Sequence, residues 1–230
     1  KDRFVADVSG DGARDADIII EAVLEDVGIK TKVLRHLESI KKPSAILATN
    51  TSSIMIEKLQ AGMEHPEHLL GLHFFNPVAQ MLLVEIVLPE KYNTNTRDRL
   101  VVFTKAIGKL PLPVKSHPGF LVNRVLLPYL SLAMRFVEEG YSPKLIDQAA
   151  LDFGMPMGPL KLCDTIGLDI CLHVSNVFEE QLGKGYAVPE ILKTMVAEGN
   201  IGMKSGKGFY RKGKPVKFHN GTILEKRGTD

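Results

Sequence analysis

His73 and Glu85 are the residues of this 230-residue chain whose types and spacing most directly suggest catalysis. His73 stands near the end of an apolar stretch, residues 68–75, and Glu85 closes the next one, residues 82–85. Histidine transfers protons at neutral pH, and a carboxylate bonded to its second ring nitrogen fixes the tautomer and stabilises the protonated ring. The pattern therefore predicts a general base, His73, oriented by Glu85. A buried structural histidine beside a surface glutamate is the alternative that the pattern leaves open.

The segments around this pair alternate between strand and helix patterns. Short apolar runs predict strands at residues 4–8, 17–23, 45–48, 68–75 and 82–85, and residues 112–115 end this section of the chain. Apolar residues at helical spacing predict helices at residues 25–40 and 96–108. Alternation of this kind is typical of an α/β fold with a mostly parallel sheet. We therefore predict such a sheet within residues 1–115.

Polar residues follow three of the predicted strands, at residues 22–25, 50–53 and 73–76. In a parallel sheet these positions share one edge, and ligands bind beyond the carboxyl ends of the strands. The three clusters together therefore predict a ligand site at that edge of the sheet.

The segment Gly10-Asp-Gly12-Ala-Arg-Asp15 comes close to the dinucleotide-binding fingerprint. That fingerprint must open a helix whose N-terminal N–H groups hold the pyrophosphate. Here a strand is expected almost at once, at residues 17–23, and Asp15 would repel phosphates. We therefore reject this segment as a phosphate site.

After residue 116 the chain changes to helical patterns. Helices are expected at residues 120–139, 143–153, 163–182 and 189–198, and each is followed by a glycine that can end it, namely Gly140, Gly154, Gly183 and Gly199. The tail at residues 202–210 lacks the glycine spacing and the preceding strand of a P-loop, so we predict a turn. Residues 116–230 are thus predicted to form an all-helical domain.

The composition excludes several classes of protein. The net charge of +2 gives no support for nucleic-acid binding, and the basic tail at residues 204–217 carries few aromatic residues. No apolar stretch is long enough to span a membrane. Cys163 and Cys171 have no nearby cysteine or histidine cluster, which argues against a metal site or a disulfide. Reduced, buried cysteines predict an intracellular protein, with cytoplasm, mitochondrion and peroxisome all left open.

Six motifs, in this order, resemble the family of L-3-hydroxyacyl-CoA dehydrogenases, including the dehydrogenase part of multifunctional fatty-acid oxidation enzymes. They are Ala48-Thr-Asn-Thr-Ser-Ser53, Gly71-Leu-His-Phe-Phe-Asn-Pro-Val78, Leu83-Val-Glu85, Pro118-Gly-Phe-Leu-Val-Asn-Arg124, Phe153-Gly-Met-Pro-Met-Gly-Pro159 and Lys204-Ser-Gly-Lys-Gly-Phe-Tyr210. That family oxidises the 3-hydroxyl of an acyl-CoA in fatty-acid beta-oxidation and passes a hydride to NAD. The resemblance implies a partial Rossmann-type NAD-binding domain at residues 1–115 and a helical dehydrogenase domain at residues 116–230.

The resemblance also implies a role for each matching residue. His73 would be the general base with Glu85 as its partner, and Ser52 and Asn123 would bind the substrate. Five residues match positions around the nicotinamide half of the cofactor, namely Ala22, Glu25, Lys30, Asn50 and Asn76. Each role has a structural alternative: Ser52 and Asn50 could cap the next helix. Asn123 could be a helix-facing amide, and Lys30 a solvated cation.

The chain departs from the family pattern at its beginning. The family opens with a strand, a glycine-rich loop, a helix and a second strand, and this sequence starts after them, so we expect it to be a fragment of a longer chain. We therefore expect that residues 1–230 alone bind NAD poorly and turn over slowly, if at all. Two rival functions remain, a related hydroxyacid dehydrogenase and a non-catalytic structural or dimerisation module. Homodimerisation through the helical half is expected by resemblance, whereas acyl chain length and a fused hydratase cannot be deduced from these residues.

Overall fold

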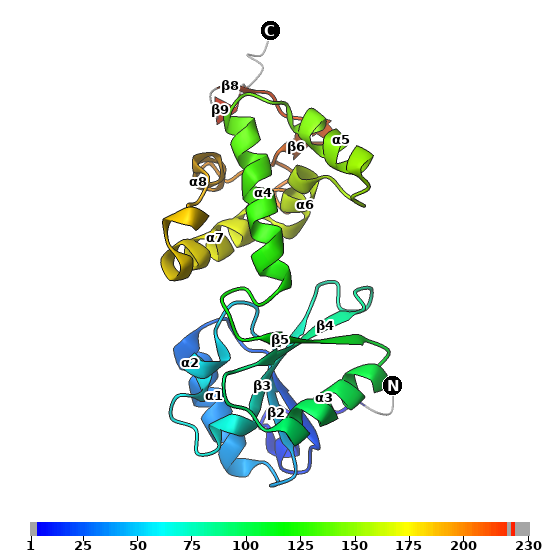
Figure 1. The fold of residues 1–230 in the computed structure, drawn as a ribbon, viewed down its shortest axis with the longest axis vertical. Helices are drawn as coiled ribbons and strands as arrows, with labels where there is room; N and C mark the ends of the chain where they lie inside the picture. Colours follow the sequence, from blue (N-terminus) through cyan, green and yellow to red (C-terminus); the bar gives the residue numbers. More distant parts are fainter. Residues whose placement is uncertain (1–3, 220–221, 224–230) are drawn as a thin grey trace. The chain divides into compact units, whose positions relative to one another are not determined.

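The computed structural model describes residues 4–219 and 222–223, and it divides into two compact units (Figure 1). One unit comprises Lys1–Leu121 and the other Val122–Asp230. Among the helices of the described residues, none is both long and apolar enough to cross a membrane.

The first unit is built on a five-stranded sheet in which neighbouring strands follow chain order. The strands are β1 (Ile18–Glu21), β2 (Ile46–Thr49), β3 (Leu69–Phe74), β4 (Leu83–Leu88) and β5 (Leu110–Lys115). All neighbours are parallel except β3 and β4, which are antiparallel. The predicted mostly parallel α/β sheet is therefore confirmed.

The strand predicted at residues 4–8 is wrong. These residues adopt no regular structure, and the side chains of Phe4, Val5 and Val8 are exposed. Within the described residues no neighbouring strand pairs with them, so their apolar pattern has no sheet to join. The following segment forms only a short 3-10 helix, η1 (Asp11–Arg14), before β1 begins. As expected, it does not open the long helix that a dinucleotide fingerprint requires.

Helices cover both faces of this sheet (Figure 1). They are α1 (Val27–Ile40), α2 (Ile56–Gln60) and α3 (Thr94–Ala106), with a 3-10 turn, η2 (Pro66–His68), before β3. Leu34 of α1 and Leu59 of α2 share one apolar cluster with the sheet, while Leu100 of α3 belongs to the other. Strands covered on both faces explain the continuous apolar runs seen in the sequence.

Strand alternation decides which face each side chain takes. On β3, Leu70 and Leu72 belong to the cluster beneath α3, whereas Leu69 belongs to the cluster beneath α1 and α2. His73 therefore points to the side of α1 and α2, because every second residue shares a face. Gly71 shares that face with His73, and a Cβ there would be 2.6 Å from Cβ of Val87 on β4 and 3.0 Å from Cδ1 of Ile56 on α2. Glycine at this position lets α2 pack closely against the strand.

The second unit is mainly helical. Its helices are α4 (Val122–Glu138), α5 (Pro143–Phe153), α6 (Pro159–Ile166), α7 (Leu168–Leu182), the 3-10 turn η3 (Lys184–Tyr186) and α8 (Glu190–Ala197). The four glycines predicted to end helices all have positive φ angles, as expected for this role. The unit is not all-helical, because the tail adds two short hairpins, β6 (Tyr210–Arg211) with β7 (Lys214–Pro215), and β8 (Phe218–His219) with β9 (Thr222–Ile223).

The single helix predicted at residues 163–182 is wrong. Gly167, with a φ of 104°, separates α6 from α7, and α6 begins four residues earlier, at Pro159. The early start depends on Asp147 of α5, whose carboxylate accepts the N–H groups of Leu160 and Lys161 at 2.8 and 3.1 Å. A cap supplied by a different helix leaves no signal beside the helix, and Pro159, a residue favoured in the first turn, was the local mark of this start.

Candidate active site

His73 and Glu85 are hydrogen-bonded partners on the first unit's sheet. They occupy directly opposite positions on β3 and β4, and Nδ1 of His73 lies 2.8 Å from Oε2 of Glu85. The Glu85 side chain is fully buried, so the alternative of a surface glutamate is wrong. Its other oxygen, Oε1, accepts the N–H of Leu121 at 3.0 Å. The carboxylate is thus fixed at both oxygens and can hold the imidazole in one orientation.

Two aromatic rings fix the imidazole from its other sides. The ring of Phe75 lies 4.5 Å from that of His73, centroid to centroid, and the ring of Phe120 lies 5.6 Å away. These contacts leave His73 only 5% exposed. A buried histidine with one nitrogen held by a carboxylate has its second nitrogen available for proton transfer.

Glu25 organises the polar turn that follows β2. Its Oε1 atom accepts the hydroxyl of Thr51 at 2.6 Å and the N–H groups of Ser52 and Ser53 at 3.0 and 3.1 Å. The hydroxyl of Ser53 also lies 3.1 Å from the same oxygen. Burial raises the pKa of Glu25, but the hydrogen bonds from Thr51 and Ser52 and the charge of Lys30 outweigh it, so the pKa falls below its ordinary value. Glu25 is therefore a charged acceptor for the whole turn.

Lys30 is buried rather than solvated, so the alternative of a solvated cation is wrong. Its side chain is 1% exposed, and its Nζ lies 2.9 Å from Oε1 of Glu21 and 3.0 Å from the carbonyl oxygen of Val23. Nζ also lies 3.4 Å from Oε2 of Glu25. On the other side of Glu21, Oε2 accepts the hydroxyl of Thr49 at 2.6 Å. One buried cation thus joins two carboxylates at the carboxyl end of β1.

Asn50 connects the ends of β2 and β3. Its Oδ1 accepts the N–H of Phe74 at 3.0 Å, which ties the residue after β2 to the residue beyond His73. Among the described residues, α2 begins after Met55 without a side-chain cap, so neither Asn50 nor Ser52 caps that helix.

The predicted site residues fall into three groups. His73, Glu85 and the three polar clusters lie together, because β1, β2 and β3 are adjacent and parallel. Ala22 and Asn76 lie at the same strand ends with exposed side chains. Asn123 lies in the first turn of α4, in the second unit.

The donor set at this edge fits part of a dinucleotide. The exposed, apolar residues 22–24 next to the half-buried Glu25 offer a surface for a flat ring with polar edges. The Gly10–Asp15 segment does not serve the pyrophosphate at this edge, since it forms only a short 3-10 helix and leads into the amino end of β1. Among the described residues, no strand of this sheet is followed at this edge by a glycine-rich loop that opens a helix, as the dinucleotide fingerprint requires. No group of three possible metal ligands occurs among the described residues.

Sequence reasoning missed Thr51, Ser53 and Glu21. The signal for the first two was present, because Thr49 to Ser53 are five small polar residues in a row. Glu21 was marked only by being a lone charge within an otherwise apolar strand. Neither pattern states which carboxylate meets which hydroxyl, since their separations of 26 to 28 residues are bridged only by the fold.

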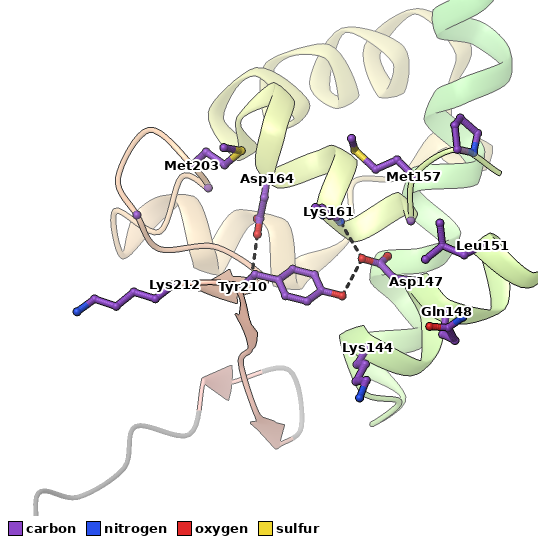
Figure 2. Close-up of a pocket in the computed structure, with 15 residues that line it drawn as sticks. Lys144, Asp147, Gln148, Leu151, Met157, Lys161, Asp164, Met203, Tyr210 and Lys212 are labelled. Carbon is purple, nitrogen blue, oxygen red and sulfur yellow. Dashed lines mark hydrogen bonds between the residues drawn. The ribbon is translucent and has the colours of Figure 1, made fainter.

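The second unit contains a separate cavity of about 560 Å³ between α5, α6 and the tail (Figure 2). Tyr210 extends from Asp164 toward Asp147, and its hydroxyl donates to Oδ2 of Asp147 at 2.7 Å. Asp164 accepts the N–H groups of Phe209 and Tyr210 at 2.9 and 2.8 Å. Both carboxylates therefore hold the tail against the helices. Burial raises the pKa of Asp164 to about 6.

Comparison with known proteins assigns both units. Residues 3–117 match the family described as "3-hydroxyacyl-CoA dehydrogenase, NAD binding domain", and residues 119–212 match the one described as "3-hydroxyacyl-CoA dehydrogenase, C-terminal domain". The fatty acid oxidation complex subunit alpha of Shewanella amazonensis is 39% identical over 206 residues, which are 90% of this chain and 29% of that protein. The same subunit of Vibrio campbellii is 40% identical over 199 residues. The chain thus spans less than a third of the length of these curated relatives.

Two solved structures that resemble this chain are 3-hydroxybutyryl-CoA dehydrogenases. The (S)-3-hydroxybutyryl-CoA dehydrogenase of Ralstonia eutropha is 38% identical, with a TM-score of 0.85 over 89% of this chain and 74% of that one. The 3-hydroxybutyryl-CoA dehydrogenase of Escherichia coli is 37% identical, with a TM-score of 0.85 over 90% of this chain and 44% of that one.

Proposed function

Because this chain belongs to the 3-hydroxyacyl-CoA dehydrogenase family, we propose that the protein containing it oxidises L-3-hydroxyacyl-CoA to 3-ketoacyl-CoA, with NAD as cofactor. The observation that carries the proposal is the buried bond between His73 and Glu85 at the edge where three polar clusters meet. That arrangement supplies a base and holds it in one orientation beside the polar residues that end the neighbouring strands. The resemblance of the second unit to the C-terminal domain of the same family supports an acyl-CoA substrate.

His73 is the general base of the proposed reaction. Its Nδ1 is bound to Glu85, which leaves Nε2 to take the proton of the substrate's 3-hydroxyl. As that proton arrives the ring becomes positive, and the adjacent buried carboxylate stabilises the charge. The C–O bond becomes a carbonyl as hydrogen leaves C3 with its electron pair.

Ser52 and Asn123 bind the substrate in this proposal. The Ser52 hydroxyl hydrogen-bonds the 3-hydroxyl oxygen, and Asn123 the region of the thioester. Bound NAD would supply the hydride acceptor. Ala22, Asn50 and Asn76 hold its nicotinamide half, and Glu25 lies beside that half. Lys30, being buried, contributes through Glu25 rather than by direct contact.

The test is the NADH absorbance change during acetoacetyl-CoA reduction by the full-length natural protein. Replacing a general base lowers kcat by about 100- to 10,000-fold, so His73→Gln is expected to lose activity to this extent. His173→Gln, the same change at an exposed position of α7, is the matched control and should retain full activity. Undiminished turnover in His73→Gln would rule out His73 as the base, and a lack of turnover in the natural protein would favour the non-catalytic module. Turnover of small hydroxyacids in preference to the acyl-CoA would favour the related hydroxyacid dehydrogenase.

We further propose that residues 1–230 by themselves bind NAD weakly and turn over slowly. The reason is that, among the described residues, no glycine-rich loop opens a helix at the carboxyl ends of the strands, where the phosphates need N–H donors. Calorimetric titration of residues 1–230 with NADH, beside the full-length protein, measures this. A low-micromolar dissociation constant for the short chain would overturn the proposal.

We also propose a homodimer formed through the second unit. Val125, Leu132 and Phe136 are exposed apolar residues on one side of α4, 67%, 51% and 37% exposed. Analytical ultracentrifugation of the full-length protein should give a dimer that Leu132→Glu dissociates. Val102→Glu, at an exposed position of α3 in the first unit, should remain dimeric. A dimer that survives Leu132→Glu would exclude this surface as the interface.

An intracellular location remains part of the proposal. Both cysteines, Cys163 and Cys171, are free and buried, which supports a reducing compartment.

A further inference from the structure

We propose that Glu25 is a positioning residue that acts in the reaction through Ser52. This inference rests on the proposed dehydrogenase function and adds to it a network that sets the geometry of the substrate-binding serine. Glu25 fixes the turn of residues 51–53, and the buried pair of Lys30 and Glu21 fixes Glu25.

The turn has no regular hydrogen-bond ladder of its own. Residues 51–53 lie between β2 and α2, outside any helix or strand, so their N–H groups need acceptors from elsewhere. Oε1 of Glu25 provides one for Ser52 at 3.0 Å and for Ser53 at 3.1 Å. Thr51 is fully buried and links the turn to the next segment, because its hydroxyl donates to Glu25 and accepts the N–H of Ile54 at 3.0 Å.

Oε1 of Glu25 already accepts several hydrogen bonds from this turn. Four donors from Thr51, Ser52 and Ser53 lie within 3.1 Å of Oε1. Oε2 lies 3.4 Å from the ammonium of Lys30. A carboxylate held in this way determines where the Ser52 backbone lies, and the backbone determines where the Ser52 hydroxyl can reach.

Lys30 is itself immobilised. Its ammonium lies between Glu21 and Glu25 and also donates to the carbonyl oxygen of Val23. Only 1% of the Lys30 side chain is exposed. Glu21 in turn accepts the hydroxyl of Thr49 on the neighbouring strand at 2.6 Å. The network therefore cross-links the carboxyl ends of β1 and β2 at the point where the proposed substrate meets the sheet.

A double-mutant cycle on the full-length protein separates action through Ser52 from direct contact with the cofactor. Displacing a reacting group by about 1 Å can cost roughly 100-fold in rate, so Glu25→Gln should lower kcat by about 10- to 100-fold. If Glu25 acts through Ser52, the variant that combines Glu25→Gln with Ser52→Ala should be within about twofold of Ser52→Ala alone. Losses that multiply, or a raised KM for NAD with kcat unchanged, would overturn the proposal.

Thr51 provides a conservative rescue. Thr51→Val removes the hydroxyl that joins Glu25 to Ile54 and should lower kcat in the same direction as Glu25→Gln. Thr51→Ser keeps the hydroxyl and should stay close to the natural rate. Equal loss in both variants would point to packing of the side chain and contradict the network.

Amide hydrogen exchange tests the same network without any activity. In Glu25→Gln the Ser52 and Ser53 amides should exchange at least about tenfold faster, with α3 unchanged. Glu180→Gln, at an exposed position of α7, is the control and should leave both amides as they were. If the natural protein lacks dehydrogenase activity, the proposed function fails, while this measurement still decides whether Glu25 holds the turn. Unchanged exchange in Glu25→Gln would overturn the inference by itself.

Discussion

His73 and Glu85 face each other across the one antiparallel junction of an otherwise parallel five-stranded sheet, with Nδ1 and Oε2 2.8 Å apart. Antiparallel neighbours place directly opposite residues on the same face, so base and carboxylate meet without any loop having to bring them together. The second oxygen of Glu85 is bound to the N–H of Leu121. The carboxylate can therefore neither rotate away from the ring nor move toward solvent.

Glu85→Gln should lower kcat by about 100-fold or more, with a much smaller effect on KM. The amide keeps the size of the side chain but loses the charge that stabilises protonated His73. Steady-state kinetics with the full-length protein measure the effect. Glu139→Gln, an exposed change at the end of α4, is the control. A kcat within threefold of natural would show that Glu85 has no part in orienting the base.

Lys30→Met should destabilise the protein strongly. The change leaves Glu21, which is 3% exposed, as a buried charge without its cation, and removing one partner of a buried pair typically costs about 3–5 kcal/mol. Adding Glu21→Gln should recover a large part of the loss, because the orphaned charge is then gone. The free energy of unfolding from urea titration measures both. Equal stability of the single and double variants would mean that the loss does not come from leaving Glu21 without its partner.

Much of the architecture could be predicted from the sequence, because apolar runs and glycine positions are local signals. The ends of α5 and the glycine after it were predicted correctly, as was the shared edge of the polar clusters. The helix start at Pro159 was missed although proline favours the first turn of a helix, because its cap, Asp147, lies on another helix. The strand prediction for residues 4–8 was wrong for a related reason. A segment with a strand pattern forms a strand only where a neighbouring strand can pair with it.

The candidate site, too, could be predicted from the sequence only in part. The types and order of residues suggested His73, Glu85 and the polar turn, but a pattern cannot show that Lys30 is buried. Its helix begins at Val27, and the sequence alone favours a solvated first-turn cation. Only the fold brings Lys30 against Glu21 and Glu25, where its charge is neutralised.

Gly208→Ala should destabilise the second unit. A Cβ at this position would be 2.0 Å from Oδ1 of Asp164, which also accepts the N–H of Phe209 and cannot move without losing that bond. Overpacking of this kind typically costs about 1–3 kcal/mol. Gly185→Ala is the matched control, because nothing lies within 4 Å of its added Cβ, and its effect should stay within about 0.5 kcal/mol. Thermal unfolding of both variants measures this difference. Equal melting temperatures for the two variants would contradict the prediction.

Asp164 should make stability fall as pH rises from about 4 to 7. Burial raises its pKa in the folded protein from 3.8 to about 6, so the folded state binds the proton more tightly than the unfolded chain. The contribution is complete below the unfolded pKa and is lost as pH rises through about 6, a change on the order of 2 kcal/mol.

Asp164→Asn isolates this contribution. The variant is less stable at every pH, because its amide nitrogen replaces an oxygen that accepts the N–H of Phe209 or Tyr210, but it cannot titrate. Its unfolding free energy should therefore lack the fall between pH 4 and 7 that the natural protein shows. Asp152→Asn, an exposed change on α5, should keep the natural slope. Parallel curves for the natural protein and Asp164→Asn would mean that Asp164 stays ionised in the fold, held by its two backbone donors.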